Sequence, residues 1–425
     1  PTSPPSQASN CTVITANCYT LRTKDKMERE YTYKMRIFPT EKQEVLLSKH
    51  FGCIRWTYNH FLDRRTKFYL EAKEKQLAKK TLTYVDMAKE LTKIKEQSET
   101  EWLNECNSQS LQHAIKHLDG AYNRFFKKLA KFPRFKSKKN KQSFRVPQFV
   151  TIEEGRIYFP KFKEGIKIDQ HRPVDGEVNY ATITRNKAGQ YYACIGVTRN
   201  IEPKPKSDKT IGIDLGLKSL VVASDGQRFE NIKTTKKYEK RLRLRQKELS
   251  RTKKGSKGRD KARLKVGKVQ VKIANIRHNH LHQISSKLIR ENQTIVCEDL
   301  SVKNMMANHC LSKAIGDASW GELVRQLTYK AGWYGRKVVK IDRYFPSSKT
   351  CSHCGYINDG LTLDQREWDC PRCQSNLDRD FNASQNILRQ GLNSLMVGTT
   401  KLAACPDVRP VRNNGQLVGA ETHLL

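Results

Sequence analysis

The spacing of apolar residues predicts a helical segment between two β-rich segments in the first half of the chain. Residues 31–38 alternate between apolar and polar side chains, as a half-buried strand does. Thr40 and Gln43 then have the spacing of a capping box, which predicts the start of a long helix. Three further segments follow from the same patterns: helices at 83–96 and 108–131, and a small β-sheet or barrel at 148–200.

Three apolar segments in the second half of the chain each meet an acidic residue. TIGIDLGLKS has the pattern of a buried strand, except that Asp214 places a carboxylate among its apolar residues. NQTIVCEDLSVKNM contains a second apolar run, which ends in Glu298 and Asp299. DRDFNASQNIL places Asp378 and Asp380 ahead of a helical run. Two strands and one helix can therefore each bring an acid to a common point.

These acids predict a metal site. Burying an unpaired carboxylate is so costly that such a group pairs, changes its pKa or binds a metal, and hard oxygen ligands select Mg²⁺ or Mn²⁺. Two such ions about 4 Å apart can activate a water and stabilise the leaving oxygen of a phosphodiester. A single acid at a strand end is more often a cap or a turn residue. Three such acids in one strongly basic chain favour phosphodiester cleavage.

Charge indicates the partner. Lys and Arg number 80 against 43 Asp and Glu, which gives a formal net charge of +37. An excess of this size predicts a polyanion, and nucleic acid is favoured over a membrane surface, which would require an amphipathic anchor helix. No apolar stretch approaches the roughly 18 residues of a membrane span. Residues 1–26 lack the pattern of a secretory signal. We therefore expect a cytoplasmic protein, associated with the nucleoid when it acts on DNA.

Two basic segments are the candidate nucleic-acid contacts. Residues 132–146 interleave aromatic and basic side chains, which fits either an exposed basic loop or a segment that tracks phosphates and stacks on bases. Residues 233–278 form two basic helical stretches with few acids, which favours a helix pair that faces nucleic acid. The candidate residues are Arg134, Lys136, Lys138, Lys139, Arg145, Lys253, Lys254, Lys257 and Arg259.

Four of the twelve cysteines form a metal-binding pattern. CSHC and CPRC are separated by fifteen residues, which is the spacing of two zinc knuckles in a reduced compartment. Four thiolates leave no open coordination position, so we predict one structural Zn²⁺. The ligands are Cys351, Cys354, Cys370 and Cys373, and Lys349, Arg366 and Arg372 are basic residues nearby that could contact nucleic acid. Disulfides are the alternative, but they would require oxidising conditions.

A rival constellation is the segment RHNHLHQ. His280 and His282 flank Leu281, as in the His-hydrophobic-His triplet of single-strand nicking transposases that use a tyrosine nucleophile. That chemistry places both histidines on one face of a strand. The apolar residues around this segment have helical spacing, which would direct the two side chains about 200° apart. We therefore reject this interpretation.

With these motifs in hand, the chain from about residue 31 to 395 resembles the TnpB family of transposon-encoded, RNA-guided DNA nucleases, relatives of the type V CRISPR effectors. The most specific stretches are GIDLGLKSLVVASDG, EDLSVKNM, SWGELVRQLTYKAGWYG, FPSSKTCSHCG and CPRCQSNLDRDFNASQNI. The resemblance implies that Asp214, Glu298 and Asp380 are catalytic and bind two Mg²⁺ or Mn²⁺ ions, with Asp378 ranked behind Asp380. It also implies a guide RNA and a DNA target as partners.

The resemblance further implies a multidomain α/β fold around an RNase H-like (RuvC) nuclease core. In order along the chain, the expected parts are a disordered extension at 1–30, a wedge-type β-barrel at 31–38 and 143–205, a helical recognition lobe at 39–142, the nuclease core at 206–350 and 374–395, the zinc ribbon at 351–373, and a C-terminal tail at 396–425. The basic helices at 233–278 would lie against the guide–target duplex.

Other hypotheses remain open at this point. A zinc-ribbon protein could bind nucleic acid and regulate transposition without cutting it, and a DDE-type transposase could join strands with the same acids and metals. Loss of cleavage on removal of Asp214 separates the first from a nuclease, and a strand-transfer assay separates the second. We expect one protein chain per RNA, with a dimer as the alternative.

Overall fold

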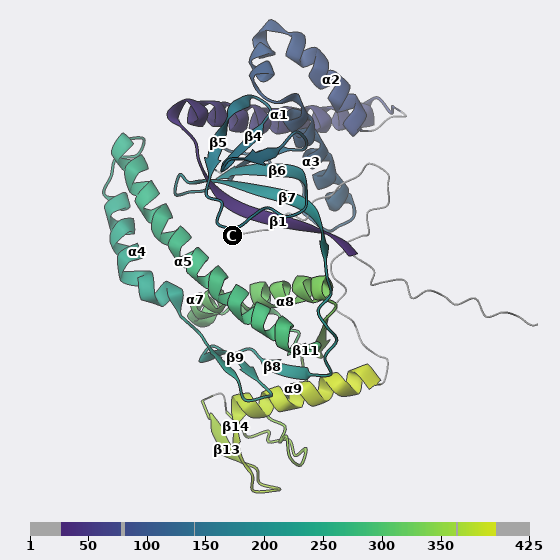
Figure 1. Ribbon diagram of the computed structural model, residues 1–425, viewed down its shortest axis with the longest axis vertical. Coiled ribbons are helices and arrows are strands. Elements are labelled where there is room, and N and C mark those ends of the chain that lie inside the picture. The colour runs from purple at the N-terminus through teal and green to yellow at the C-terminus, as the bar shows by residue number, and fades with distance from the viewer. Residues whose placement is uncertain (1–26, 78–80, 140, 363, 397–425) are drawn as a thin grey trace, which may run out of the picture.

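The computed structural model describes residues 27–77, 81–139, 141–362 and 364–396. The predicted extension at 1–26 and the tail from 397 lie outside the described residues. The described chain is a mixed α/β structure with two main sheets, and a small cysteine-bearing module lies at one end of the long axis (Figure 1). None of the described helices is both long enough and apolar enough to cross a membrane.

The first sheet is built mostly from the predicted β-rich segments. Its seven strands are β1 (Met27–Phe38), β2 (Gln142–Val146), β3 (Thr151–Glu153), β4 (Arg156–Phe159), β5 (Phe162–Ile168), β6 (Glu177–Arg185) and β7 (Tyr191–Ile201). They pair in the order β2-β6-β7-β1-β5-β4-β3. Strand β1 begins at Met27, so residues 27–30 belong to the sheet and not to the predicted extension. Among the described residues β2 and β3 do not pair, and closure into a barrel is not confirmed.

Helices α1 (Glu41–Glu74) and α3 (Ser108–Phe126) pack against this sheet. Helix α2 (Tyr84–Glu96) and the 3₁₀ helix η1 (Ser98–Glu105) pack on these helices. The predicted capping box at Thr40 is present, because its hydroxyl accepts from the backbone of Gln43 and the Gln43 side chain accepts in return. Met35 and Ile195 of the sheet share one buried core with Phe61 of α1 and Leu118 of α3.

Helix α3 ends earlier than its apolar pattern predicted. The prediction extended to residue 131, whereas the helix ends at Phe126. Lys128 has a left-handed backbone with φ of 59°, and the amide of Leu129 donates to the carbonyl of Arg124. This is the hydrogen-bond pattern of a Schellman motif, which terminates a helix independently of the apolar residues that follow.

The second sheet holds the predicted acidic segments. Its strands are β8 (Thr210–Asp214), β9 (Ser219–Ala223), β10 (Arg228–Glu230), β11 (Thr294–Glu298) and β12 (Lys337–Ile341). The order is β10-β9-β8-β11-β12, with β8, β9 and β10 antiparallel and β8, β11 and β12 parallel. The helices of this half are α4 (Thr234–Ser250), α5 (Lys257–Glu291), α6 (Val302–Met305), α7 (His309–Ala318), α8 (Trp320–Tyr334) and α9 (Arg379–Met396).

The central strands of the second sheet are covered on both faces. Ile211 and Ile295 point to the core shared with α5 and α8. The next residue in β11, Val296, points to the opposite face, where it packs with Ile387 of α9. Figure 1 shows α9 on the side of the sheet away from α5 and α8. Because side chains alternate along a strand, every second residue of β8 and β11 faces α9.

Helix α9 approaches the sheet so closely that two contacts require glycine. A Cβ atom on Gly212 of β8 would lie 2.3 Å from the carbonyl oxygen of Ser384 and 2.6 Å from the amide nitrogen of Leu388. A Cβ atom on Gly391 of α9 would lie 2.4 Å from a methyl group of Val296 in β11. These two glycines therefore fix the distance between α9 and the parallel strands.

The cysteine-bearing module connects β12 to α9. It contains a two-stranded sheet of β13 (Glu367–Asp369) and β14 (Asn376–Asp378). Its small core consists of Leu361, Trp368 and Leu377 together with buried cysteines. A core of this size is too small to be stable alone, which is typical of a module that depends on a bound metal.

Gly212→Ala should destabilise the protein by about 1–3 kcal/mol, because the added methyl group meets backbone atoms of α9 that cannot rotate away. Chemical denaturation of both proteins measures the difference. Gly321→Ala in α8 is the control, because a Cβ atom there meets nothing within 4 Å. Equal stability of the two variants would contradict the close contact of α9 with β8.

Candidate metal and nucleic-acid sites

Asp214 and Glu298 lie at the same edge of the second sheet. Strands β8 and β11 are parallel neighbours in which Ile213 is paired with Cys297, so the two acids follow at the carboxyl ends of both strands. Side chains alternate between the two faces along each strand. Asp214 therefore points to the same face as Gly212, and Glu298 points to the same face as Val296. That is the face covered by α9. The pairing register therefore brings together two residues that are 84 positions apart in the sequence.

Asp380 joins them from the first turn of α9. Its side chain is only 12% exposed, and it lies 3.3 Å from the guanidinium of Arg366 and 3.8 Å from that of Arg379. Asp378, ranked second at this position, has a different role. Its carboxylate accepts from the amide of Phe381 at 2.8 Å, as an N-cap does, and forms an ion pair with Arg228 at 3.0 Å. The structure therefore favours Asp380 as the third acid.

The three carboxylates influence one another electrostatically. Burial, followed by the negative charges of Glu298 and Asp380, raises the pKa of Asp214 to about 7. Burial also raises the pKa of Glu298, against a hydrogen bond from Ser347 that lowers it. A raised pKa means that the site opposes its own ionisation. A divalent cation among these groups would remove that cost.

Asp299, the neighbour of Glu298, is not part of this group. It forms ion pairs with Lys340 at 3.0 Å and Arg343 at 2.6 Å. A hydrogen bond from Lys340 lowers the pKa of Asp299. Asp299 is thus neutralised by the protein itself, whereas Asp214 and Glu298 are not.

The acids form an open arrangement. Among the described residues, the four clustered cysteines are the only group of three or more potential metal ligands whose donor atoms all lie within 4.8 Å of one another. The oxygens of Asp214, Glu298 and Asp380 are therefore spread more widely.

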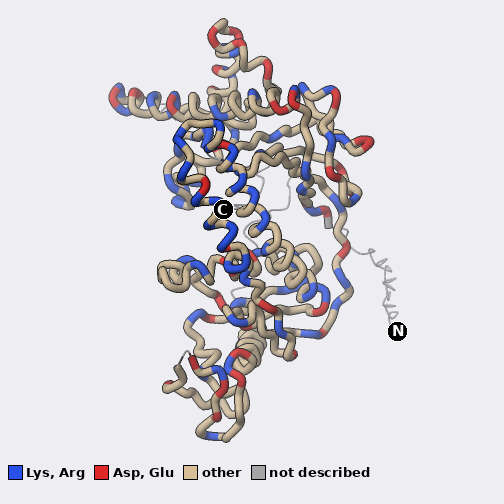
Figure 2. Tube along the Cα trace, turned by 90° about the vertical axis from the view of Figure 1, so that its left-hand side faces the viewer, with Lys and Arg blue, Asp and Glu red and all other residues tan. Residues whose placement is uncertain are grey.

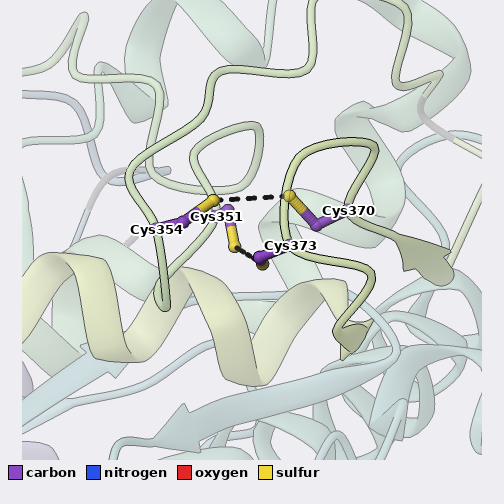
Figure 3. A group of neighbouring side chains, drawn as sticks. All are labelled: Cys351, Cys354, Cys370 and Cys373. Carbon is purple, nitrogen blue, oxygen red and sulfur yellow. Dashed lines mark hydrogen bonds between the residues drawn. The ribbon is translucent and has the colours of Figure 1, made fainter.

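The predicted zinc ligands do come together. Figure 3 shows Cys351 facing Cys373 and Cys354 facing Cys370, with Sγ–Sγ distances of 3.6 and 3.5 Å. A Zn–S bond of about 2.3 Å in a tetrahedron requires sulfur atoms about 3.8 Å apart, so the four residues fit a zinc ion. Neither Sγ–Sγ distance is that of a disulfide, which is about 2.05 Å.

The basic residues near this module turn toward the protein. Arg366, predicted to contact nucleic acid, forms an ion pair with Asp380. Lys349 donates to the carbonyl oxygen of Asp359 at 3.2 Å. Arg372 is exposed. Arg366 is exposed as well, whereas Lys349 is half-buried, so Arg366 and Arg372 both have the exposure expected of a nucleic-acid contact.

The predicted basic helices are α4 and α5. Figure 2 shows Lys and Arg residues along this pair. Arg259 has an internal role, because its guanidinium donates to the carbonyl oxygens of Leu249 and Thr252 at 3.0 and 2.9 Å and thereby closes the end of α4. The other candidates in the turn are exposed: Lys253, Lys254 and Lys257.

The basic segment at residues 132–146 contains both exposed cations and cations packed on aromatic rings. Its exposed members are Arg134, Lys138 and Lys139. The Nζ atom of Lys136 lies 4.0 Å from the ring centre of Tyr58. The guanidinium carbon of Arg145 lies 3.4 Å from the ring centre of Tyr180. These cation–π contacts hold the two side chains at the surface of the protein. Contact of this segment with nucleic acid stays a prediction.

The two histidines of the rival motif have separate partners. Both lie in α5, as their spacing predicted. His280 contacts the carbonyl oxygen of Glu230 at 2.9 Å, whereas His282 contacts His278 at 3.0 Å. They do not share a face, so the nicking-transposase interpretation is not supported.

Comparison with known proteins places this geometry in a family. Family models match residues 191–309 ("Probable transposase") and 320–387 ("Cas12f1-like, TNB domain"). A third, described as a helix-turn-helix domain, matches residues 27–74, where the structure has strand β1 and the single long helix α1.

Curated relatives cover nearly the whole chain. A protein of Streptomyces pristinaespiralis named "Putative RNA-guided DNA endonuclease" is 38% identical over 90% of this chain and 93% of its own. A protein of Escherichia coli named "Putative RNA-guided DNA endonuclease InsQ" is 32% identical over 88% of this chain and 95% of its own. The chain therefore belongs to the TnpB family.

A solved structure gives a more distant match. The Cas12f1–sgRNA–target DNA complex aligns with 85% of this chain and 98% of its own at a TM-score of 0.49 and 13% identity.

Cys351→Ser should lower the zinc content of the purified protein by about one equivalent, because three thiolates no longer complete the tetrahedral site. Atomic absorption on the folded protein measures the change. Cys310→Ser is the control, because Cys310 is exposed and lies outside the cluster. Unaltered zinc content in the Cys351 variant would refute the assignment.

The metal-free protein should lose stability as the pH rises from about 4 to about 7. In this window the folded state retains the Asp214 proton and the unfolded state has released it, so each further rise in pH favours unfolding. Asp214→Asn should remove up to about 4 kcal/mol of this loss, at about 1.4 kcal/mol per pKa unit. Denaturation at several pH values, with exposed Asp208→Asn as control, measures the slope. Identical slopes would exclude the raised pKa.

Proposed function

We propose that this chain is an RNA-guided DNA endonuclease that cuts phosphodiesters with two divalent cations held by Asp214, Glu298 and Asp380. The observation that carries the proposal is that β8, β11 and α9 bring these acids to one edge of the second sheet, where burial and, after it, the charges of Glu298 and Asp380 raise the pKa of Asp214. The name shared by the two curated relatives supports the same activity.

The residues of the site have distinct tasks. Asp214, Glu298 and Asp380 would hold the cations, and Ser347 orients Glu298 through its hydrogen bond. Mg²⁺ or Mn²⁺ bound there would supply an activated water and stabilise the leaving 3′ oxygen. Arg366 and Arg379 lie beside Asp380 and can attract the phosphate backbone of a bound strand.

The topology supports an RNase H-like core of the RuvC type. Three antiparallel strands followed by two parallel ones form its sheet, and the first acid lies on the first strand. The parts inferred from the sequence fit around it: the core at 206–350 and 374–395 and the zinc ribbon at 351–373. We further propose that the first sheet serves as the wedge and the helices within 39–142 as the recognition lobe.

Guide RNA and target DNA are the proposed partners. Base pairing would choose the sequence, while the protein reads duplex shape and a short adjacent motif, as RNA-guided effectors do. The exposed lysines between α4 and α5 supply positive charge along such a duplex.

Glu298→Gln should reduce cleavage to background while leaving RNA binding intact, because the amide cannot replace a carboxylate ligand. The substrate is a plasmid complementary to the RNA that co-purifies with the protein from its native locus. Asp299→Asn is the matched control, because this neighbouring acid is paired with Lys340 and Arg343. Cleavage should persist in that variant.

The same assay includes the contradicting outcomes. Unchanged cleavage in Glu298→Gln would remove the site assignment. RNA binding without cleavage by the unaltered protein would favour a regulator, and strand joining would favour a transposase. Random RNA fragments in the purified complex would contradict guided activity.

A further inference from the structure

The segment between β12 and the first zinc ligand lies against both candidate metal sites. Ser347 is buried, at 6% exposure, and its hydroxyl donates to Oε1 of Glu298 at 2.5 Å. Four residues later the same segment reaches Cys351. This short stretch therefore contacts a carboxylate of the acid site at one end and supplies a zinc ligand at the other.

Two buried asparagines of α9 hold this segment in place. Asn382 and Asn386 are 1% and 2% exposed and lie one helical turn apart, so their side chains emerge on one face. The Asn386 amide donates to the carbonyl oxygens of Ser347 and Thr350 at 2.9 and 2.5 Å. The Asn382 amide donates to the Thr350 carbonyl at 2.7 Å.

Asn382 also accepts a hydrogen bond beyond the first cysteine. Its carbonyl oxygen receives the amide of Ser352 at 2.7 Å. Asn382 is two residues from Asp380 in the same helix, so the first turns of α9 carry both an acid of the proposed site and the anchor of the zinc module. Asn382 is hydrogen-bonded through both its amide nitrogen and its carbonyl oxygen, which restricts its side chain, because movement would leave buried polar atoms unpaired.

We propose that Ser347, Asn382 and Asn386 are positioning residues that couple the zinc site to the acid site. This inference rests on the proposed function, since it concerns the divalent ions of that site. Zinc would fix the position of Cys351. The two asparagines hold the backbone between Cys351 and Ser347, and Ser347 orients Glu298 through its hydrogen bond. By reciprocity, occupancy of the acid site strengthens the binding of zinc.

Ser347→Ala tests the link to Glu298. Mn²⁺ binding to the zinc-loaded protein, followed by electron paramagnetic resonance, should weaken about tenfold, as is typical when a partner of a metal ligand is removed. Zinc content should be unchanged. Ser348→Ala is the matched control, and Asp214→Ala defines the Mn²⁺ that belongs to the acid site. Cleavage by Ser347→Ala should recover at saturating Mn²⁺, which a folding defect would not allow.

The outcomes separate this inference from the proposed function. If the unaltered protein binds no Mn²⁺ that depends on Asp214, the proposed acid site itself is wrong. If it does bind, and Ser347→Ala binds equally well, the acid site stands and the positioning role of Ser347 is refuted.

Asn382→Ala tests the coupling. This variant should both weaken Mn²⁺ binding and accelerate zinc release to a colorimetric chelator, each by at least about threefold, whereas exposed Asn393→Ala on the same helix should change neither. If Asn382→Ala does not fold, Asn386→Ala is the substitute. It removes the hydrogen bonds to the carbonyl oxygens of Ser347 and Thr350, and we expect the same two effects. Loss of zinc retention alone, with unchanged Mn²⁺ binding, would overturn the coupling.

Discussion

The close contact between α9 and the second sheet is the constraint on which the candidate site depends. Asp380 is useful to the other two acids only if α9 lies directly on β8 and β11. Gly212 permits that approach from the strand and Gly391 from the helix. A Cβ atom at either position would lie 2.3–2.4 Å from an atom of the other layer, so the layers would have to move apart. The packing of α9 on the sheet therefore also determines the distances between the acids.

The position of the acids makes their ionised forms unfavourable in the folded protein. Asp214 has a pKa of about 7 because burial and two neighbouring acids disfavour its charge. The protein neutralises Asp299 with Lys340 and Arg343 but leaves Asp214 without such a partner. Local destabilisation of this kind is common where function requires it. A divalent cation would convert the repulsion into binding energy, and the hydrogen bond from Ser347 holds Glu298 in place.

The sequence was sufficient for the main elements, and it named the acids as candidates whose catalytic role stays a prediction. The strand and helix patterns around Asp214, Glu298 and Asp380 were correct, because apolar periodicity reports burial directly. The cysteine spacing was equally informative. The choice between Asp378 and Asp380 followed from resemblance alone, and only the cap on Phe381 shows why Asp378 is structural.

Other features could not be predicted because they depend on tertiary contacts. Nothing local distinguishes Ser347 from Ser348, since the hydrogen bond to Glu298 arises from the path of the loop. Arg259 looked like a surface cation, but it bonds to the end of α4, and Arg366 is exposed yet forms an ion pair with Asp380. The end of α3 at Phe126 followed from backbone geometry at Lys128, a residue with no unusual sequence preference. Gly212 was the one available clue, because glycine inside a strand often marks a close approach.

The most direct test of the account is a crystal structure of the zinc-loaded protein soaked with Mn²⁺, with the anomalous scattering of manganese measured. The account predicts manganese peaks bonded to oxygens of Asp214, Glu298 and Asp380, at about 2.2 Å, at the edge of β8 and β11 beneath the first turn of α9. Manganese bound elsewhere, with these three carboxylates free of metal at saturating Mn²⁺, would contradict it.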